Sequence, residues 1–256
     1  MFTFLAALQF MTTLPVPLKR VVEADDLARG GRYFPLVGLV IGLILTIIYA
    51  LLILFLPASL VALLLVLALL ALTGALHFDG FLDSCDGLFG YHPTARRLEI
   101  MRDSRVGTFG VAGGFGLLAL KYAGLSLVPP FLMLPALFLA PFLGRWALLG
   151  AVMLFPYGRE SGLGLLYKRY THRADFILAS VFVAGLSYAF LRLPGLLLAL
   201  SVLLLTWLVG RWIMTKLPAG LTGDNYGAIA ELTEMFVWLV IGAGAGWITG
   251  FNFFNF

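Results

Sequence analysis

The chain has 256 residues, of which 61% are hydrophobic and 12% are charged. Soluble domains are normally about 45–50% apolar and about 25% charged, so this composition excludes a water-soluble globular protein and places the chain in lipid. The net charge of +4 is spread over several segments without a basic stripe, which argues against a nucleic-acid partner, and the single Cys85 excludes an intrachain disulfide framework.

Apolar segments follow one another along the chain. Residues 1–17 are interpreted as a retained interfacial or re-entrant helix, with a cleaved signal sequence as the alternative. A spanning helix needs about 20 mostly apolar residues, and such segments lie at 34–56, 58–76, 108–128, 131–155, 176–191, 194–213 and 235–252. Prolines at 57, 129, 130 and 194 end helices and separate hairpins. We predict one domain, residues 1–256, that is an all-α integral membrane bundle of about seven transmembrane helices.

The polar residues fall between these spans and mostly on one side. With seven spans, segments 1–33, 77–107, 156–175 and 214–234 share a side and hold all 13 acidic residues, all three histidines and most of the basic residues, Lys19 included. An excess of Lys and Arg marks the cytoplasmic side, so we expect the chemistry to face the cytoplasm. Lys121 and Arg145 fall within spans and are expected to face the bundle interior, where Arg145 could reach a phosphate.

The first polar cluster follows the second span and contains His77, Asp79, Asp83 and Asp86. If the helix continues, the three aspartates are spaced i, i+4, i+7 and share one face. Unpaired carboxylates so placed repel one another, and a cation relieves that repulsion. All-oxygen ligation favours Mg²⁺, with Mn²⁺ as the alternative, over Zn²⁺. A solvated helix end with arginine partners is the competing interpretation, and His77 is a ligand, a base or a helix-end residue.

The second polar cluster contains Arg102, Asp103 and Arg105. Guanidinium groups match phosphate geometry, so the two arginines are candidate phosphate ligands. Asp103 would complete the metal site or hold an arginine in place. An intrahelical ladder of ion pairs is the alternative, and it is our interpretation of Arg96, Arg97 and Glu99.

Two further clusters are rich in glycine. In the segment 157–170, Arg159 is a candidate phosphate ligand, and the tyrosines either stack on a nucleobase or belong to the interfacial aromatic belt. In the segment 220–231, Asp224 and Asn225 are oxygen donors suited to a metal edge or a ribose hydroxyl. Glu231 and Glu234 are expected at a helix start, where they would cap the macrodipole.

Aspartates for a divalent metal and arginines for phosphate together predict phosphoryl-group transfer from a diphosphate donor. The metal would neutralise the leaving group, the arginines would hold the equatorial oxygens, and one aspartate would accept the proton of an attacking hydroxyl.

Four motifs of this chain resemble the cobalamin synthase family, also called the adenosylcobinamide-GDP ribazoletransferases. They are GALHFDGFLDSCDGLFG at 74–90, LEIMRDSRVGTFG at 98–110, RESGLG at 159–164 and LTGDNYGAIAE at 221–231, and the earlier RGGRYFPLVG at 29–38 extends the resemblance over nearly the whole chain. The resemblance implies a magnesium-dependent enzyme of a prokaryotic inner membrane that joins adenosylcobinamide-GDP to α-ribazole, or its 5′-phosphate, and releases GMP. It places His77, Asp79, Asp83 and Asp86 on the family's H-x-D-G-x-x-D-x-x-D-G pattern, Asp103–Arg105 on its D-S-R stretch and Thr222–Asp224 on its T-G-D stretch.

The expected site therefore has two parts. The catalytic residues would be His77 and the aspartates at 79, 83, 86 and 103, the aspartates also binding the metal. The substrate ligands would be Arg102, Arg105, Arg145, Arg159, Asp224 and Asn225. The expected partners are the two substrates and membrane lipid, and the sequence leaves a homo-oligomer open.

Two other functions compete with this one. A CDP-alcohol phosphotransferase of lipid synthesis also uses aspartates on membrane helices, but its usual D-G-x-x-A-R motif is absent from this sequence. A cation transporter would place acids near mid-span, and the predicted spans contain none.

Overall fold

The computed structural model describes residues 1–18 and 20–246. Lys19 and residues 247–252, the end of the seventh expected span, therefore lie outside the described residues. The helices are α1 (Phe2–Met11), α2 (Ala24–Gly30), α3 (Phe34–Leu52), α4 (Ala58–Leu72), α5 (Leu76–Phe89), α6 (Thr94–Ile100), α7 (Thr108–Ser126), α8 (Pro130–Leu154), α9 (Leu163–Tyr170), α10 (Arg173–Met214) and α11 (Gly223–Ala243), with a 3-10 turn at Gly31–Tyr33. The expected all-α class is confirmed, because the described ranges contain no β-strand.

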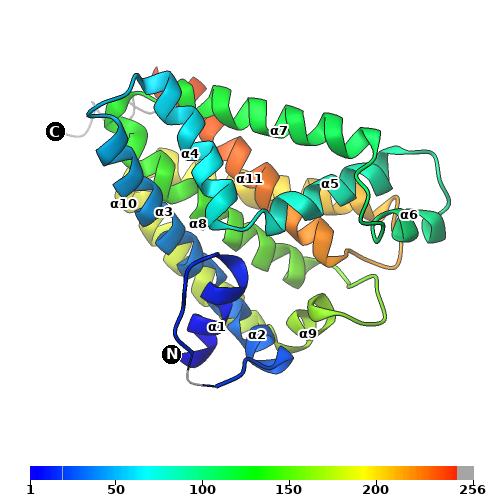
Figure 1. The fold of residues 1–256 in the computed structure, drawn as a ribbon. Helices are drawn as coiled ribbons and strands as arrows, with labels where there is room; N and C mark the ends of the chain where they lie inside the picture. The colour runs from blue at the N-terminus through cyan, green and yellow to red at the C-terminus, as the bar shows by residue number, and fades with distance from the viewer. Residues whose placement is uncertain (19, 247–256) are drawn as a thin grey trace.

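Helix α8 lies at the centre of the bundle. It packs against α3, α10 and α11, and it is apolar and buried along nearly its whole length (Figure 1). A helix that is hydrophobic on every side belongs in a protein core or across a membrane, and α8 is buried among its neighbouring helices. Helix α3 approaches it closely because Gly38 and Gly42 present no side chain: a Cβ at Gly42 would lie 2.9 Å from the Leu137 carbonyl oxygen. Both glycines are therefore packing contacts between α3 and α8.

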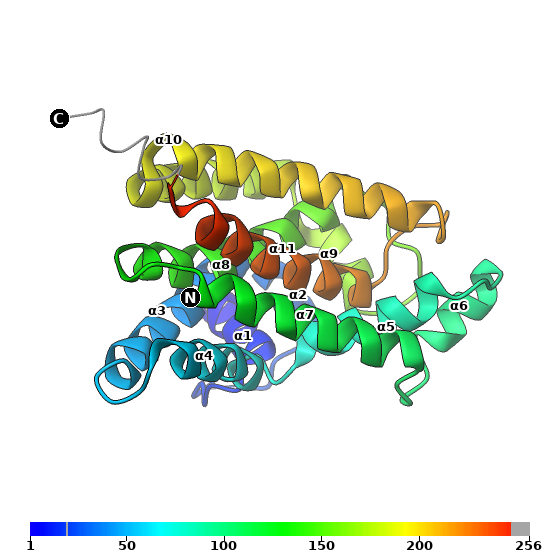
Figure 2. The same ribbon diagram turned by 90° about the horizontal axis from the view of Figure 1, so that it is seen from above.

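The chain is a multi-pass membrane protein, but the count of seven spans is not confirmed. By length and composition five helices could cross a membrane, or six if the bent pair of α4 and α5 is one span. Helix α10 contains the break that was expected beside Pro194, since Arg192 leaves the helical region (φ 54°, ψ −137°). Phe176 before the break and Thr206 after it both lie beside Gly150 of α8, so the two parts run side by side (Figure 2).

The chain turns by 91° between α4 and α5. Gly74 and Ala75 make this turn in the left-handed region, with φ of 57° and 56°, which glycine adopts without a steric penalty and alanine adopts at some cost. The second span therefore ends at Leu72 rather than at residue 76, and the turn interrupts the helix before the aspartates. The aspartates occupy a separate helix, α5, which packs against α7 and α11.

Helix α11 starts earlier than expected, at Gly223 rather than near residue 235. Thr222 caps it: the Thr222 backbone N–H donates to the Asn225 side-chain oxygen (2.9 Å), and the Asn225 N–H donates to the Thr222 hydroxyl (3.4 Å). Glu231 and Glu234 consequently lie inside a candidate span and are buried. The expectations that they cap a helix start and that all acids lie outside the spans are both wrong.

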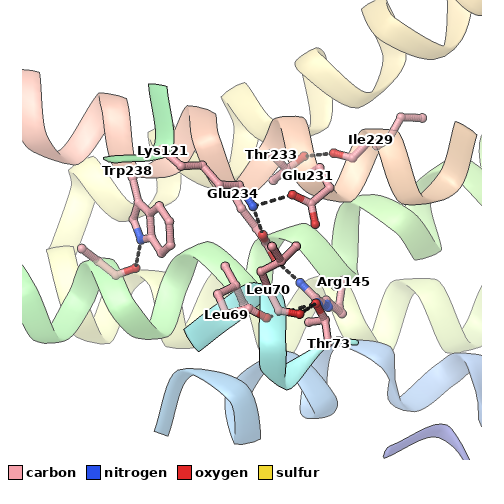
Figure 3. A network of polar contacts seen from close by, with 11 residues as sticks. Leu69, Leu70, Thr73, Lys121, Arg145, Ile229, Glu231, Thr233, Glu234 and Trp238 are labelled. Carbon is pink, nitrogen blue, oxygen red and sulfur yellow. Dashed lines mark hydrogen bonds and ion pairs between the residues drawn. The ribbon is translucent and has the colours of Figure 1, made fainter. Parts of the chain in front are cut away.

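The buried acids pair with the two basic residues that were expected to face the interior. Lys121 donates to Glu231 (2.6 Å) and to Glu234 (2.5 Å), and Arg145 donates to Glu234 (Figure 3). The interior location of Lys121 and Arg145 is confirmed, since both are almost completely buried. These four side chains, named here the buried quartet, contribute two positive and two negative charges.

Candidate active site

A cavity of about 580 Å³ lies where α5 and α11 meet the segment between α8 and α9. Its lining includes five of the predicted site residues: His77, Asp79, Arg102, Arg159 and Asp224. Small-molecule sites typically enclose about 300–1,000 Å³, so the cavity is large enough for a substantial part of a substrate. The structure thus brings together residues from all four polar clusters.

Close packing of α5 on α11 places the two carboxylates of the cavity. A Cβ at Gly80 would lie 2.9 Å from the Asp224 backbone, so only glycine permits this approach. Asp79 precedes Gly80 on α5, and Asp224 stands in the first turn of α11. Asp79 and Asp224 therefore line the same cavity from two helices.

Arg159 is fixed against α11. Its guanidinium donates to Asp224 (2.8 Å), and both side chains are largely buried. The backbone on either side is held as well, because Gly158 N–H donates to the Leu221 carbonyl (2.8 Å) and Leu221 N–H to the Pro156 carbonyl (2.9 Å). This pairing of segments fixes a guanidinium at the cavity wall, where it can bind an anion.

Asp83 and Asp86 lie on α5 outside the cavity lining. The expected i, i+4, i+7 arrangement is confirmed, since α5 is helical from Leu76 to Phe89. Asp86 accepts hydrogen bonds from the N–H groups of Gly107 (2.7 Å) and Gly110 (2.8 Å), so it caps the start of α7. Asp83 is half-buried, and Asp224 and Asp79 are near enough to repel its carboxylate.

In the second polar cluster, Arg102 lines the cavity, whereas Asp103 and Arg105 are exposed outside it. Arg105 donates to both carboxylate oxygens of Asp103 (3.0 and 2.7 Å). These hydrogen bonds lower the pKa of Asp103 to about 2, so the carboxylate is ionised at neutral pH. The pairing agrees with one of the two expected roles of Asp103, holding an arginine in place, and its expected part in the metal site stays a prediction.

The ladder of ion pairs expected at α6 is only partly present. Arg96 pairs with Glu99 (2.9 Å), as expected. Arg97 is instead buried and donates to the carbonyls of Gly87 (2.8 Å) and Leu88 (2.6 Å), so it satisfies the C-terminal end of α5.

Besides Arg105, two more predicted substrate ligands lie outside the cavity lining. Asn225 donates to the Ser84 hydroxyl (3.0 Å) and so joins α11 to α5. Arg145 is held in the buried quartet by Glu234. Their expected roles toward substrate stay predictions.

The donor set of the site suits magnesium by its chemistry. Among residues 1–18 and 20–246, no group of three or more His, Cys, Asp or Glu side chains is arranged to hold a metal ion. Asp79, Asp83 and Asp224 nevertheless supply carboxylate oxygens on two packed helices, and their mutual repulsion is what a divalent cation would relieve. The magnesium site stays a prediction.

Sequence reasoning missed part of the cavity. Helix α1 contributes Phe10 and Met11, and α11 contributes Tyr226, whose ring centroid lies 6.3 Å from that of Tyr157. Tyr157 is half-buried, and burial raises its pKa above the usual value. The tyrosines at 157 and 167 were candidates for stacking, but an apolar side chain in a short helix such as α1 looks the same in sequence whether it faces lipid or a cavity.

Known proteins resemble the chain over most of its length. A family model described as cobalamin-5-phosphate synthase matches residues 3–242. Three relatives are each named adenosylcobinamide-GDP ribazoletransferase. That of Roseiflexus sp. (strain RS-1) is 39% identical over 229 residues, covering 90% of this chain and 85% of the relative. That of Thermoanaerobacter pseudethanolicus is 37% identical over 231 residues (90% and 92%), and that of Desulforamulus reducens is 38% identical over 237 residues (92% and 94%). No solved structure matches the chain. The chain therefore belongs to the cobalamin-5-phosphate synthase family, whose members are transferases of cobalamin biosynthesis.

Proposed function

We propose that this enzyme transfers the adenosylcobinamide phosphate group of adenosylcobinamide-GDP to a ribose hydroxyl of α-ribazole, or of α-ribazole 5′-phosphate, whose own 5′ oxygen carries the phosphate. The products are GMP and adenosylcobalamin, or adenosylcobalamin phosphate. The observation that carries the proposal is the cavity, where Arg102 and Arg159 stand beside the carboxylates Asp79 and Asp224 in a chain of this family. Guanidinium groups and carboxylates in one cavity suit a diphosphate donor and a hydroxyl acceptor.

The proposed reaction is a direct displacement at phosphorus. A ribose hydroxyl oxygen of the acceptor attacks the phosphorus that carries the cobinamide, and the bond from that phosphorus to the oxygen of GMP breaks. Arg102 and Arg159 hold the phosphate oxygens, with Arg159 exchanging its bond to Asp224 for one to the donor. The proton of the hydroxyl passes to a group of the cavity, for which His77 and the carboxylates Asp79 and Asp224 are the candidates.

Magnesium is part of the proposal. Asp79, Asp83 and Asp224 would hold the ion, and when bound it supplies positive charge to the diphosphate and the departing GMP. Mn²⁺ has similar ligand preferences and is the alternative ion.

Turnover tests the proposal directly. The purified chain in lipid nanodiscs is incubated with adenosylcobinamide-GDP and α-ribazole, with Mg²⁺ or with EDTA, and products are identified by chromatography and mass. We expect adenosylcobalamin and GMP in equal amounts, and only with the metal. If folded protein forms no product with either acceptor, the assignment fails, and CDP-alcohol donors become the next substrates.

One substitution tests the aspartates of α5. Asp83→Asn keeps the shape of a half-buried side chain but removes its charge, so we expect turnover to fall at least about 100-fold, with normal insertion into membranes. Glu99→Gln, an exposed change outside the cavity, is the matched control and should retain full turnover. Near-normal turnover of Asp83→Asn would remove this carboxylate from the mechanism.

A further inference from the structure

Several buried polar atoms of the cavity lining lack a partner. Among the described residues, buried side-chain atoms without a hydrogen bond include His77 Nδ1, Arg159 Nε and the hydroxyls of Tyr167 and Tyr226. All four residues line the cavity described above. A buried polar group without a partner is costly, and four of them around one cavity indicate a ligand that supplies the missing hydrogen bonds.

The lining differs between its two sides. Helices α5 and α11, the segment after α6 and the loop at 157–159 supply the charged residues. Helix α1, the start of α3 and helix α9 supply Phe10, Met11, Phe34 and Tyr167. The rings of Phe34 and Tyr167 meet edge to face at a centroid distance of 5.0 Å. In Figure 1, α1 and α9 lie below α5 and α11. We call Phe10, Met11, Phe34 and Tyr167 the aromatic end of the cavity.

The aromatic end offers hydrocarbon surface and one free hydroxyl. Phe10 is partly exposed and Tyr167 is 6% exposed, so these two side chains provide the accessible surface, while Phe34 and Met11 are almost completely buried beside the cavity. The Tyr167 hydroxyl is among the unpartnered buried atoms of the described chain. Such a surface suits a planar ring system with few polar atoms. A ring system with several polar edge atoms would leave most of them unpaired there.

The inference rests on the proposed function. The bases of its two substrates differ in their number of polar edge atoms, so the aromatic end can distinguish them. The base of α-ribazole is a dimethylated benzimidazole, which is planar, largely apolar and has a single free ring nitrogen that accepts a hydrogen bond. Guanine carries several donors and acceptors on its edges. We propose that the aromatic end binds the benzimidazole of the acceptor, with the Tyr167 hydroxyl donating to its ring nitrogen and Phe10 and Met11 of α1 covering its methyl groups. The guanosine diphosphate part of the donor then lies toward Arg102 and Arg159.

The position of α1 fits this role. Its C-terminal end is tied to the turn before α5, since Thr13 N–H donates to the Leu72 carbonyl (2.8 Å) and the Thr13 hydroxyl to the Ala71 carbonyl (3.1 Å). Phe10 and Met11 are therefore held beside the helix that carries the aspartates. In this arrangement α1 determines which acceptor base the enzyme accepts.

The test measures acceptor binding without the donor. The full chain in lipid nanodiscs is titrated with α-ribazole by calorimetry, and KM is then measured for each substrate. Tyr167→Phe removes a hydroxyl that has no partner within the described fold, so it should fold normally. We expect it to weaken α-ribazole binding about 3–10-fold, the contribution of one hydrogen bond, with the donor KM unchanged. Tyr170→Phe is its control, because the Tyr170 hydroxyl contacts Asp25 outside the cavity.

A second pair of variants tests the methyl groups. Phe10→Ala should weaken α-ribazole binding and reduce the preference for it over the riboside of unsubstituted benzimidazole. In the wild type we expect that preference to be at least about 10-fold. Phe4→Ala is the control on the same helix, since Phe4 packs against Tyr33 away from the cavity.

The outcomes separate this inference from the proposed function. If α-ribazole binding depends on Tyr167 and Phe10, the subsite is supported. If that binding is seen but no GMP is released, only the proposed transfer reaction is refuted. If the enzyme turns over and Tyr167→Phe and Phe10→Ala bind α-ribazole as well as their control variants do, the subsite is overturned and the proposed function stands. A rise in the donor KM instead of the acceptor KM, or a wild type that does not bind α-ribazole, also overturns it.

Discussion

Glu234 is the residue on which the buried quartet depends. It accepts hydrogen bonds from both Lys121 and Arg145, whereas Glu231 accepts from Lys121. The Lys121 ammonium also lies 5.9 Å from the centre of the Trp238 ring, which gives it a second favourable contact. Because the charges balance, none of the four residues carries an uncompensated charge into the bundle.

The quartet leads to a prediction about stability. Glu234→Gln keeps the size of the side chain but leaves one excess positive charge buried, and breaking a buried pair from one side costs about 3–5 kcal/mol. We expect a fall of that order in the free energy of unfolding, measured by denaturation in mixed micelles.

Glu99→Gln is the control for this measurement, because it removes an exposed ion pair and should leave the unfolding midpoint unchanged. Equal stability of Glu234→Gln and Glu99→Gln would show that the quartet does not stabilise the fold.

Residue types alone predicted part of the buried quartet and of the candidate active site. Lys121 and Arg145 were expected inside the bundle because a charge in a span is costly in lipid, and both lie there. Two buried cations require anions, yet Glu231 and Glu234 were expected at a helix start outside the span because the start of α11 was placed too late. Asp86 matches the aspartate pattern as well as Asp79 does, and only the structure shows that it caps α7.

At the scale of elements, close contact between helices depends on single glycines. A Cβ at Gly38 would lie 2.7 Å from Phe142 Cα, so α3 cannot stay against α8 if residue 38 has a side chain. Small residues at helix interfaces drive packing within membranes, where the hydrophobic effect between helices is weak.

Leucine at position 38 should therefore separate α3 from α8. We expect Gly38→Leu to lower the free energy of unfolding by about 1–3 kcal/mol or more, the usual cost of overpacking, in the same micelle assay.

Gly116→Leu is the matched control on α7, since a Cβ at Gly116 would meet no other heavy atom of the described chain within 4 Å. If both variants are equally stable, the α3–α8 contact is not a tight one.

Element boundaries were predictable where proline sets them and not where capping does. The helix breaks at Pro57, Pro129 and Pro194 follow from the missing N–H and fixed φ of proline, and α4, α8 and the break in α10 agree with them. The turn at Gly74–Ala75 and the cap at Thr222 depend on backbone conformation and a reciprocal hydrogen bond. Hydropathy does not report either feature, so α5 and α11 were misplaced.

At the scale of the whole molecule, the polar segments collect at one end. Figure 1 shows α6, α9 and the start of α11 at the end of the bundle opposite the C-terminus. The Lys and Arg residues of those segments favour a cytoplasmic location for that end. Cys85 cannot report the orientation, because it is buried and would react slowly with a reagent on either side.

Introduced cysteines can test the orientation. In a Cys85→Ala background, Ser104→Cys lies exposed near α6, and Ser59→Cys lies exposed at the start of α4, at the opposite end. We expect an impermeant maleimide added to intact cells to label Ser59→Cys rapidly and Ser104→Cys only after lysis. The reverse pattern would place the cavity outside the cytoplasm.

The buried quartet also has a consequence for how the protein is made. Lys121 and Glu231 are 110 residues apart, so the ribosome delivers both cations to the membrane well before their partners. At about 5–20 residues per second, translation takes roughly 5–20 s to cover that interval. During this time the insertion machinery, water or lipid phosphates must accommodate Lys121 and Arg145. A nascent chain interrupted before α11 would keep two uncompensated cations among its helices, a lesion that cellular proteases could recognise. Synthesis of α11 thus completes the charge balance of the newly made enzyme.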